Sequence, residues 1–367
     1  MKILLINHQI RPELSGVASH FENISKNLLL LGSEVLRLTV KDNNFKKKDL
    51  RIRYYFFEYR KKAPFQANKD NEERIRENYA NFESSLKKID CESIDVVITS
   101  NDIYLSILKK YIDPQKILAI IPSSLTFSKH SNPNDYKSTI ERIKRNAKGI
   151  HLVVLSEKMK SMLLNLLGSD YQISVIPPGV DFEKFSQSHR RQNTNSLLFV
   201  GRIAEEKNIP ALIDAARQVK NPYFLRIIGT GPLLEEMNQL VKKSSLNKKI
   251  IFEGRKTRVE EYYAQANIFV LPSKYEAFGL VILEAMASGL PVIAFRPGND
   301  VITASDEIIT DSVDGFLVSD TLEMAEKIDL LLKDSQLRIH MGDNAILKAR
   351  QYVWKSHVKN LLQVLKR

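Results

Sequence analysis

The sequence has few of the residues that stabilise small exported proteins, and it has no long apolar segment. A single cysteine, Cys91, excludes a disulfide framework. The first apolar stretch ends after Ile6, which is too short for the core of a signal peptide. No run approaches the ~20 apolar residues of a membrane-spanning helix. We therefore expect a cytoplasmic protein, at most peripheral to the inner face of a membrane.

Motifs for metal and nucleic acid are also missing. There is no D-x-D triplet and no tight cluster of His, Cys and Asp, so we expect no metal and no other cofactor. The net charge of +12 favours an anionic partner, and residues 1–180 hold 29 Lys and Arg against 20 Asp and Glu. Zinc-finger spacing and aromatic RNA-binding motifs are absent, so we expect that partner not to be nucleic acid.

Short apolar runs alternate with amphipathic helical patterns along the chain. Runs that are apolar on both faces and separated by helices are typical of buried parallel strands. In the first half the expected strands are 2–6, 34–40, 95–99, 116–121, 151–155 and 173–176. In the second half they are 196–200, 224–228, 250–252, 268–271, 292–295 and 316–318. Two such series predict an α/β protein with two Rossmann-like, doubly wound domains.

A domain boundary is expected at Pro177, Pro178 and Gly179, because two prolines and a glycine end a strand. We assign residues 1–178 to the first domain and residues 179–350 to the second. A basic helix is expected over 351–367.

The most informative segment is 273–291, which follows the expected strand 268–271. Its helix should begin near Phe278 and Gly279 and end at Gly289. Free backbone N–H groups at a helix start bind anions, and a glycine there lets a phosphate approach the backbone. The segment therefore predicts a phosphate site.

Two acids flank this helix start. Glu276 precedes the helix and Glu284 lies within it. One carboxylate could reach a sugar hydroxyl and the other a ribose diol, with phosphate between them. If Glu276 is the acid that reaches the sugar, its loss should spare binding of the free nucleotide. A surface helix with two solvated glutamates is the alternative interpretation.

Two cations follow the expected strand 196–200. Arg202 and Lys207 lie on the next loop and helix start, where ligands of open α/β sheets bind. An arginine fork and a mobile lysine charge suit a diphosphate, although two solvated cations would fit the pattern as well. The turn 229–231 and the loop 7–16 are weaker signals, since ordinary strand-to-helix connections explain both.

Taken together, these segments resemble the family 4 retaining glycosyltransferases, which have the GT-B fold. The resemblance covers nearly the whole chain and is strongest over 173–291, where 176–181 resembles the crossing between domains. It implies two Rossmann-like domains facing each other across a cleft. It also implies that the terminal helix 351–367 packs back on the first domain.

The resemblance also implies roles for residues. Arg202 and Lys207 match the family's diphosphate-binding pair and Glu276 its donor-sugar acid, and these three form the expected catalytic set. Glu284 matches the acid on the donor ribose, and Arg255 borders the base. The expected donor-binding residues are Gly16, Arg202, Lys207, Arg255, Glu276, Phe278, Gly279, Leu280 and Glu284.

Two departures from the family concern the first domain. Its first loop usually carries two glycines, and here it reads Ser15-Gly16. The family often has a histidine after its fourth strand, where this chain has 122–124, Pro-Ser-Ser. His130 lies too far along to match and fits a surface histidine. A protein that binds a nucleotide sugar without transferring it, as an epimerase or an inert partner subunit, is therefore the alternative.

The family's mechanism is front-face displacement, in which the leaving diphosphate takes the acceptor's proton. We expect metal-independent transfer of a hexose to a hydroxyl acceptor, with a UDP-sugar favoured and GDP-mannose second. Cell-surface polysaccharide or glycolipid synthesis, with a sugar or lipid-linked acceptor, is the expected setting.

The segment 41–62 is unusual in composition. It holds nine Lys and Arg, including 46–48, and six aromatic residues, including 54–57. Basic residues contribute ~1 kcal/mol each near an anionic leaflet, and aromatic side chains favour the interface. The segment could dock the first domain on an anionic membrane. The alternative is an ordinary strand over 51–59 with its aromatic residues in the core.

Overall fold

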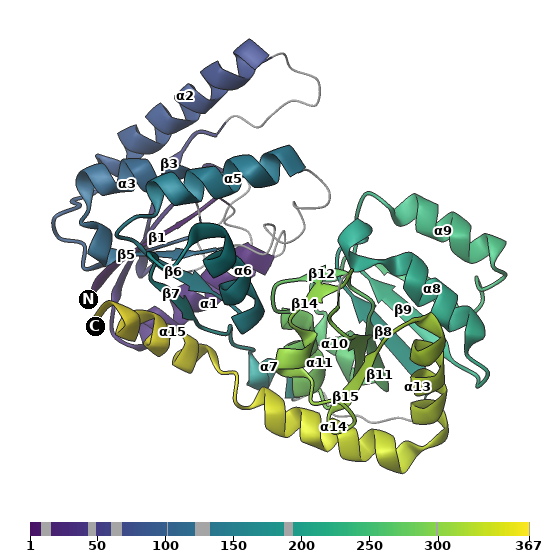
Figure 1. Ribbon diagram of the computed structural model, residues 1–367. Coiled ribbons are helices and arrows are strands. Elements are labelled where there is room, and N and C mark those ends of the chain that lie inside the picture. Colours follow the sequence, from purple (N-terminus) through teal and green to yellow (C-terminus); the bar gives the residue numbers. More distant parts are fainter. Residues whose placement is uncertain are drawn as a thin grey trace. The chain divides into compact units, whose positions relative to one another are not determined.

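The structure is a computed structural model that describes residues 1–8, 16–42, 49–59, 68–100, 102–121, 133–186, 194–298 and 300–366 (Figure 1). The chain forms two compact units. Unit 1 comprises Met1–Leu155, Met159–Ile176 and Trp354–Arg367, and unit 2 comprises Ser156–Lys158 and Pro177–Val353. Each unit is built on one large sheet, and each is described by itself.

Unit 1 holds a parallel sheet in the order β3-β2-β1-β4-β5-β6-β7. Its strands are β1 (Lys2–Asn7), β2 (Glu34–Val40), β3 (Ile52–Phe57), β4 (Val96–Thr99), β5 (Ile117–Ile120), β6 (His151–Val154) and β7 (Ile173–Val175). The chain winds outward from β1 to one edge and then from β4 to the other, which is the doubly wound order that the alternating pattern predicts.

Helices cover this sheet on both faces. They are α1 (Gly16–Leu30), α2 (Asn68–Leu86), α3 (Leu105–Tyr111), α5 (Pro133–Asn146), α6 (Glu157–Leu167) and α15 (Trp354–Gln363). The helix α1 ends because Gly32 takes φ +76°, and Ser33 N then donates to Leu28 O at 3.0 Å.

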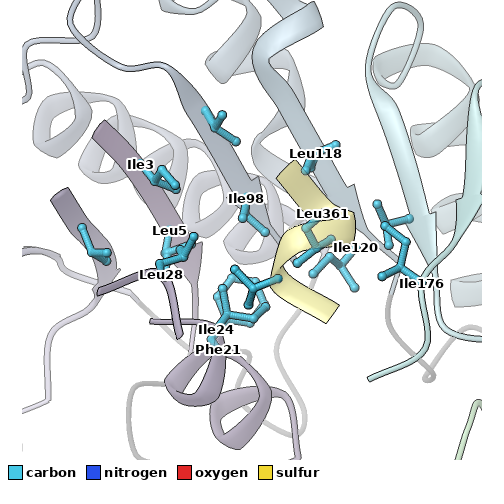
Figure 2. Close-up of a cluster of buried hydrophobic side chains, with 14 of the residues drawn as sticks. Ile3, Leu5, Phe21, Ile24, Leu28, Ile98, Leu118, Ile120, Ile176 and Leu361 are labelled. Atoms are coloured by element: carbon cyan, nitrogen blue, oxygen red, sulfur yellow. The ribbon is translucent and has the colours of Figure 1, made fainter. Parts of the chain in front are cut away.

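The core of unit 1 depends on its last helix. Figure 2 shows Leu361 of α15 beside Ile98 and Ile120 of the sheet, with Phe21 and Ile24 of α1 nearby. All five side chains are buried. Truncating a buried leucine of this kind to alanine costs ~2–5 kcal/mol, so α15 is an integral part of unit 1.

Unit 2 holds a six-stranded parallel sheet in the order β10-β9-β8-β11-β13-β15. Its strands are β8 (Ser196–Val200), β9 (Phe224–Ile228), β10 (Ile250–Gly254), β11 (Ile268–Leu271), β13 (Val292–Phe295) and β15 (Gly315–Val318). A small parallel pair, β12 (Tyr275–Glu276) and β14 (Ile302–Thr303), forms a separate two-stranded sheet. The helices are α7 (Phe182–Ser186), α8 (Ile209–Gln218), α9 (Leu234–Lys243), α10 (Glu260–Gln265), α11 (Leu280–Ala287), α12 (Ser305–Ile308), α13 (Thr321–Lys333) and α14 (Ser335–Ala349).

The unit boundaries differ slightly from the expected domains 1–178, 179–350 and 351–367. The second unit begins at Pro177, and the returning segment begins at Trp354. Residues 156–158 group with unit 2, although the sequence predicts them in the first domain. The reason is an acid far along the chain: Glu307 accepts the backbone N–H groups of Glu157 and Lys158 at 2.8 Å each.

The strand β3 is not among the strands that the apolar runs predict. It falls in the segment 41–62 and forms the edge of the sheet beside β2. Ile52 and Phe57 are buried, Arg53 is exposed, and the aromatic side chains between them are half-buried. This part of the segment is the ordinary strand of the alternative interpretation, while residues 43–48 and 60–62 lie outside the described residues.

Candidate functional site

The second-unit residues singled out in the sequence gather at one edge of its sheet. Strand β8 pairs with β9 on one side and with β11 on the other. All three strands are parallel, so the loops that leave their carboxyl ends begin at the same edge. These loops are 201–208, 229–233 and 272–279. The carboxyl edge of a parallel sheet is where open α/β folds bind ligands.

Two of these loops touch backbone to backbone. A Cβ on Gly229 would lie 1.8 Å from Gly201 O, and one on Gly231 would lie 2.1 Å from Ile203 O. Ile203 N donates to Thr230 O at 3.0 Å across the same contact. Only glycine fits at 229 and 231, so these residues hold the two loops together.

Lys207 and Glu276 form an ion pair between the loop after β8 and the strand β12. Their side chains are only 16% and 17% exposed. Lys274 N also donates to Glu206 O at 3.0 Å, which ties the same two loops through the backbone. The expected diphosphate-binding lysine and the expected sugar-binding acid are therefore partners in this structure.

Arg202 is also held by a carboxylate. Its Nη2 and Nε donate to Glu206 Oε1 at 2.6 and 3.0 Å. The Arg202 side chain is 60% exposed, whereas that of Glu206 is 12% exposed. Glu206 Oε2 is buried and has no hydrogen-bond partner among the described residues. Both expected cations thus contact an acid, and Glu206 is not among the site residues that the sequence predicts.

The helix α11 begins as a phosphate site would require. It starts at Leu280, and Gly279 is its N-cap with φ +95°. A Cβ on Gly279 would lie 3.0 Å from Ile282 Cδ1 and 3.3 Å from Glu276 Cγ, so both conformation and space favour glycine. No side chain caps this helix start, and Phe278 beside it is buried. Its first backbone N–H groups can therefore receive an anion.

The other end of α11 lies close to the expectation. The helix ends at Ala287, two residues before the predicted end at Gly289, which takes φ +73°. Leu290 N then donates to Ala285 O at 3.0 Å. This is a common glycine-dependent helix end.

Glu284 lies just over one turn into α11. Its Oε2 accepts a hydrogen bond from the Tyr263 hydroxyl at 2.9 Å. Burial raises the pKa of the Glu284 carboxyl to about 7, and the hydrogen bond from Tyr263 partly opposes that rise. Tyr263 carries no sequence signal, because it is one of several aromatic residues before an ordinary buried strand.

A small hollow lies behind Glu276. It has about 10 Å³ open to a water molecule and is lined in part by Ser273, Thr303 and Ser305. Thr303 Oγ1 and Ser305 Oγ are 2.9 Å apart and bonded to each other, and Ser305 Oγ also donates to Phe295 O. Ser273 Oγ is buried without a hydrogen-bond partner among the described residues. This volume is about that of one water.

Two expected donor-binding residues, Arg255 and Gly16, take no part in the contacts described above. Arg255 follows β10 and is exposed to solvent. Gly16 belongs to unit 1 and begins α1, and a Cβ added to it would meet nothing within 4 Å. Ser15, residues 122–124 and His130 lie outside the described residues.

Two features are absent from the described residues. No group of three or more His, Cys, Asp and Glu side chains in that part of the chain could hold a metal ion. No described helix is long and apolar enough to cross a bilayer.

The comparisons identify sequence relatives. Residues 181–348 match the family model of glycosyl transferases group 1. The chain is 28% identical over 206 residues to an uncharacterized glycosyltransferase of Haemophilus influenzae, covering 55% of this chain and 57% of that protein. It is 27% identical over 352 residues to the alpha-monoglucosyldiacylglycerol synthase of Streptococcus pneumoniae, covering 86% of this chain and 75% of that protein. The chain thus spans little more than half of the length of the first relative.

Solved structures establish the fold. The chain is similar to HepE of Anabaena, solved in complex with UDP and glucose, with a TM-score of 0.80 and 18% identity. The match covers 100% of this chain and 99% of that chain. The expected GT-B fold, with its two Rossmann-like domains, is confirmed.

Proposed function

We propose that the protein transfers a hexose from a nucleotide sugar to a hydroxyl acceptor, and the match of residues 181–348 to the family model of glycosyl transferases group 1 supports this proposal. The observation that carries this proposal is the gathering of Arg202, Lys207 and the α11 start at one edge of the unit 2 sheet. The transfer is metal-independent and retains the anomeric configuration. A UDP-sugar is the favoured donor and GDP-mannose the second choice.

The chemistry centres on the leaving diphosphate. Arg202 and Lys207 exchange their carboxylate partners for diphosphate oxygens, and the backbone N–H groups from Phe278 to Leu280 add donors. Charge that develops on the departing diphosphate is stabilised there, and the diphosphate accepts the proton of the acceptor hydroxyl. Loss of one such charge contact raises the barrier by ~2.7–4 kcal/mol, by analogy with oxyanion-hole donors.

The two acids select the rest of the donor. Glu276, once released by Lys207, accepts hydrogen bonds from the sugar hydroxyls. Glu284 accepts from the ribose diol, and Arg255 borders the base. Gly16, at the start of α1, is the remaining donor-binding residue of the proposal and contributes its backbone amide. These roles make Arg202, Lys207 and Glu276 the catalytic residues of the proposal.

The setting is cytoplasmic synthesis of a cell-surface polysaccharide or glycolipid. Support for a uridine nucleotide comes from HepE, which was solved with UDP and glucose. Support for a lipid-linked acceptor comes from the Streptococcus pneumoniae relative, whose name describes a glycolipid synthase.

Nucleotide selection and product analysis test this function together. A ligand at 100 times its Kd stabilises the native protein by ~2.7 kcal/mol, so UDP, UDP-glucose, GDP and GDP-mannose are compared by thermal shift. The nucleotide sugar that stabilises the protein is then prepared with a radiolabel in its hexose and is incubated with the protein and a hydroxyl acceptor. Labelled glycoside of retained configuration is the expected product. Stabilisation with an epimerised or unchanged donor would instead favour an epimerase or an inert partner subunit.

A second proposal concerns an anionic membrane surface. Leu50 is 91% exposed in the turn before β3, and Arg51 beside it pairs with Asp49 through Nη2 at 2.7 Å. Beside cationic side chains that are attracted to an anionic leaflet, an exposed leucine would add an apolar contact with the membrane. The lysines at 46–48, which would supply most of the charge, lie outside the described residues.

Vesicle co-sedimentation tests the membrane proposal. Binding should require anionic lipid, fall with added salt, and weaken when the lysines at 46–48 become serine. Equal binding to neutral and anionic vesicles, or no binding at low salt, would refute it. Replacement of Leu50 by serine separates the apolar contribution, which salt does not screen.

A further inference from the structure

Tyr263 connects the helix α10 to the acid that the proposed function assigns to the donor ribose. Its side chain is fully buried, and its hydroxyl donates to Glu284 Oε2 at 2.9 Å. Burial raises the pKa of Tyr263 well above its usual value, so the hydroxyl keeps its proton and remains a donor. The hydrogen bond therefore has a fixed direction.

The ring of Tyr263 is held rigidly. Phe185 of α7 packs against it edge to face, with ring centroids 5.4 Å apart. Phe269 of β11 lies 5.6 Å away on another side. Because three elements meet at this ring, the hydroxyl has little freedom to move, and Glu284 Oε2 is anchored to the core of unit 2.

The second carboxylate oxygen is left available. Glu284 Oε1 accepts no hydrogen bond from the described residues, and the side chain keeps part of its surface open to solvent. Two charged groups on neighbouring elements act on the carboxyl: Lys184 of α7 lowers its pKa and Glu260 of α10 raises it. These two are themselves paired at 3.2 Å, so they largely offset each other. The Tyr263 hydrogen bond is then the main local influence that favours the carboxylate.

We infer that Tyr263 is the positioning residue for Glu284: it holds Oε2 so that Oε1 faces the ribose diol and can accept from its hydroxyls. This inference rests on the proposed function, because it needs Glu284 to contact the ribose. The competing explanation is that Tyr263 only fills space in the core. In that case the ring alone would matter, and removal of the hydroxyl would not affect the ribose contact.

The substitution Tyr263→Phe removes the hydroxyl and keeps the ring packing. Calorimetry measures the affinity of the intact protein for UDP and for 2′,3′-dideoxy-UDP, which lacks the ribose diol. We expect UDP to bind about tenfold more weakly to the variant, because a Glu284 carboxylate that is no longer anchored loses the equivalent of about one charged hydrogen bond to the ribose diol. The dideoxy compound should bind equally to both proteins, because it makes no bond to Glu284.

The pH profile supplies a second readout. Because the Tyr263 hydrogen bond lowers the pKa of Glu284, its removal should raise that pKa. As the pH is lowered, the affinity of the variant for UDP should therefore decline at a higher pH than that of the unaltered protein. A residue that only fills space would leave this midpoint unchanged.

Tyr223 provides a matched control. It is a buried tyrosine of the same unit, and its hydroxyl donates to Ala216 O at 2.6 Å. Tyr223→Phe should change neither the affinity for UDP nor its pH midpoint. Replacing Glu284 by Gln together with Tyr263→Phe should weaken UDP binding no more than Glu284→Gln alone.

The outcomes separate the inference from the function. If the unaltered protein binds UDP or GDP but Tyr263→Phe binds it equally well, the inference is overturned and the function stands. Equal weakening toward UDP and the dideoxy compound would assign Tyr263 to packing and also overturn it. If the unaltered protein binds neither UDP nor GDP, the proposed function is refuted, and the inference that rests on it is refuted as well.

Discussion

The pairing of Lys207 with Glu276 leads to an unusual prediction: Glu276→Gln should tighten binding of free UDP while it slows transfer. In the ligand-free protein the carboxylate holds the lysine that the diphosphate needs. An incoming diphosphate must draw Lys207 away and also meets the negative charge of Glu276. The amide removes both penalties, yet it no longer accepts hydrogen bonds from the donor sugar as a carboxylate does.

The burial of the Lys207–Glu276 ion pair determines how strongly it should oppose UDP binding. Exposed ion pairs are worth ~0–1 kcal/mol, whereas removing one partner of a buried pair costs ~3–5 kcal/mol. Both side chains are mostly but not fully buried, so we place the pair at ~1–2 kcal/mol. Since ~1.4 kcal/mol corresponds to a factor of ten, UDP should bind about tenfold more tightly to the variant.

Calorimetry with UDP at constant pH and ionic strength measures this change. Glu326→Gln is the matched control, because Glu326 is exposed on α13 and its loss changes the net charge equally. The control should bind UDP as the unaltered protein does. Transfer is measured in parallel with labelled nucleotide sugar, and only Glu276→Gln should reduce it.

Unchanged or weaker UDP binding by Glu276→Gln would refute this reasoning, because it would mean that the ion pair does not compete with the diphosphate. The family resemblance alone predicts nearly unchanged binding, since it assigns Glu276 to the sugar and not to the lysine. The experiment therefore distinguishes the contact in the structure from the pattern in the sequence.

Three further predictions concern Arg202, the metal and His20. Arg202→Ala should weaken UDP binding about tenfold to a hundredfold, as for a hydrogen bond to a charged group, with an unchanged circular dichroism spectrum. Transfer should persist in EDTA, and activity that chelation abolishes and Mg²⁺ or Mn²⁺ restores would contradict the metal-independent proposal. Burial beside His357 lowers the pKa of His20 well below 6.5, so the unfolded chain binds more protons at low pH. The free energy of unfolding should then fall by up to about 1.4 kcal/mol per pH unit below pH 6.5, and by less in His20→Gln; equal slopes in urea titrations of the two proteins would contradict this.

Most of the fold could be predicted from local pattern. Buried parallel strands are apolar on both faces, so nearly every strand of the two large sheets appears as a short run between helices. The edge strand β3 is the main exception in unit 1. Its exposed Arg53 and half-buried aromatic residues give a mixed pattern that also suits an interfacial segment.

The site was only partly predictable. Gly279 and the start of α11 follow from local chemistry, because a glycine after a buried strand predicts a helix start that is open to a ligand. Local chemistry does not predict which acid pairs with which cation. Lys207 and Glu276 meet because β8 and β11 are neighbours in the sheet, and that adjacency is a property of the whole fold. Tyr263 reaches Glu284 for a similar reason, across the packing of two helices.

The return of Trp354–Arg367 to unit 1 has a consequence for synthesis on the ribosome. The seven strands of the first sheet are translated before most of unit 2, yet the helix that completes their core is translated only after unit 2. Until α15 emerges, Phe21, Ile24 and Leu28 lack the cover that Val358 and Leu361 provide. Unit 1 therefore reaches its full stability only after translation of unit 2. A nascent chain that stalls before Trp354 leaves this apolar surface exposed, where chaperones can bind it.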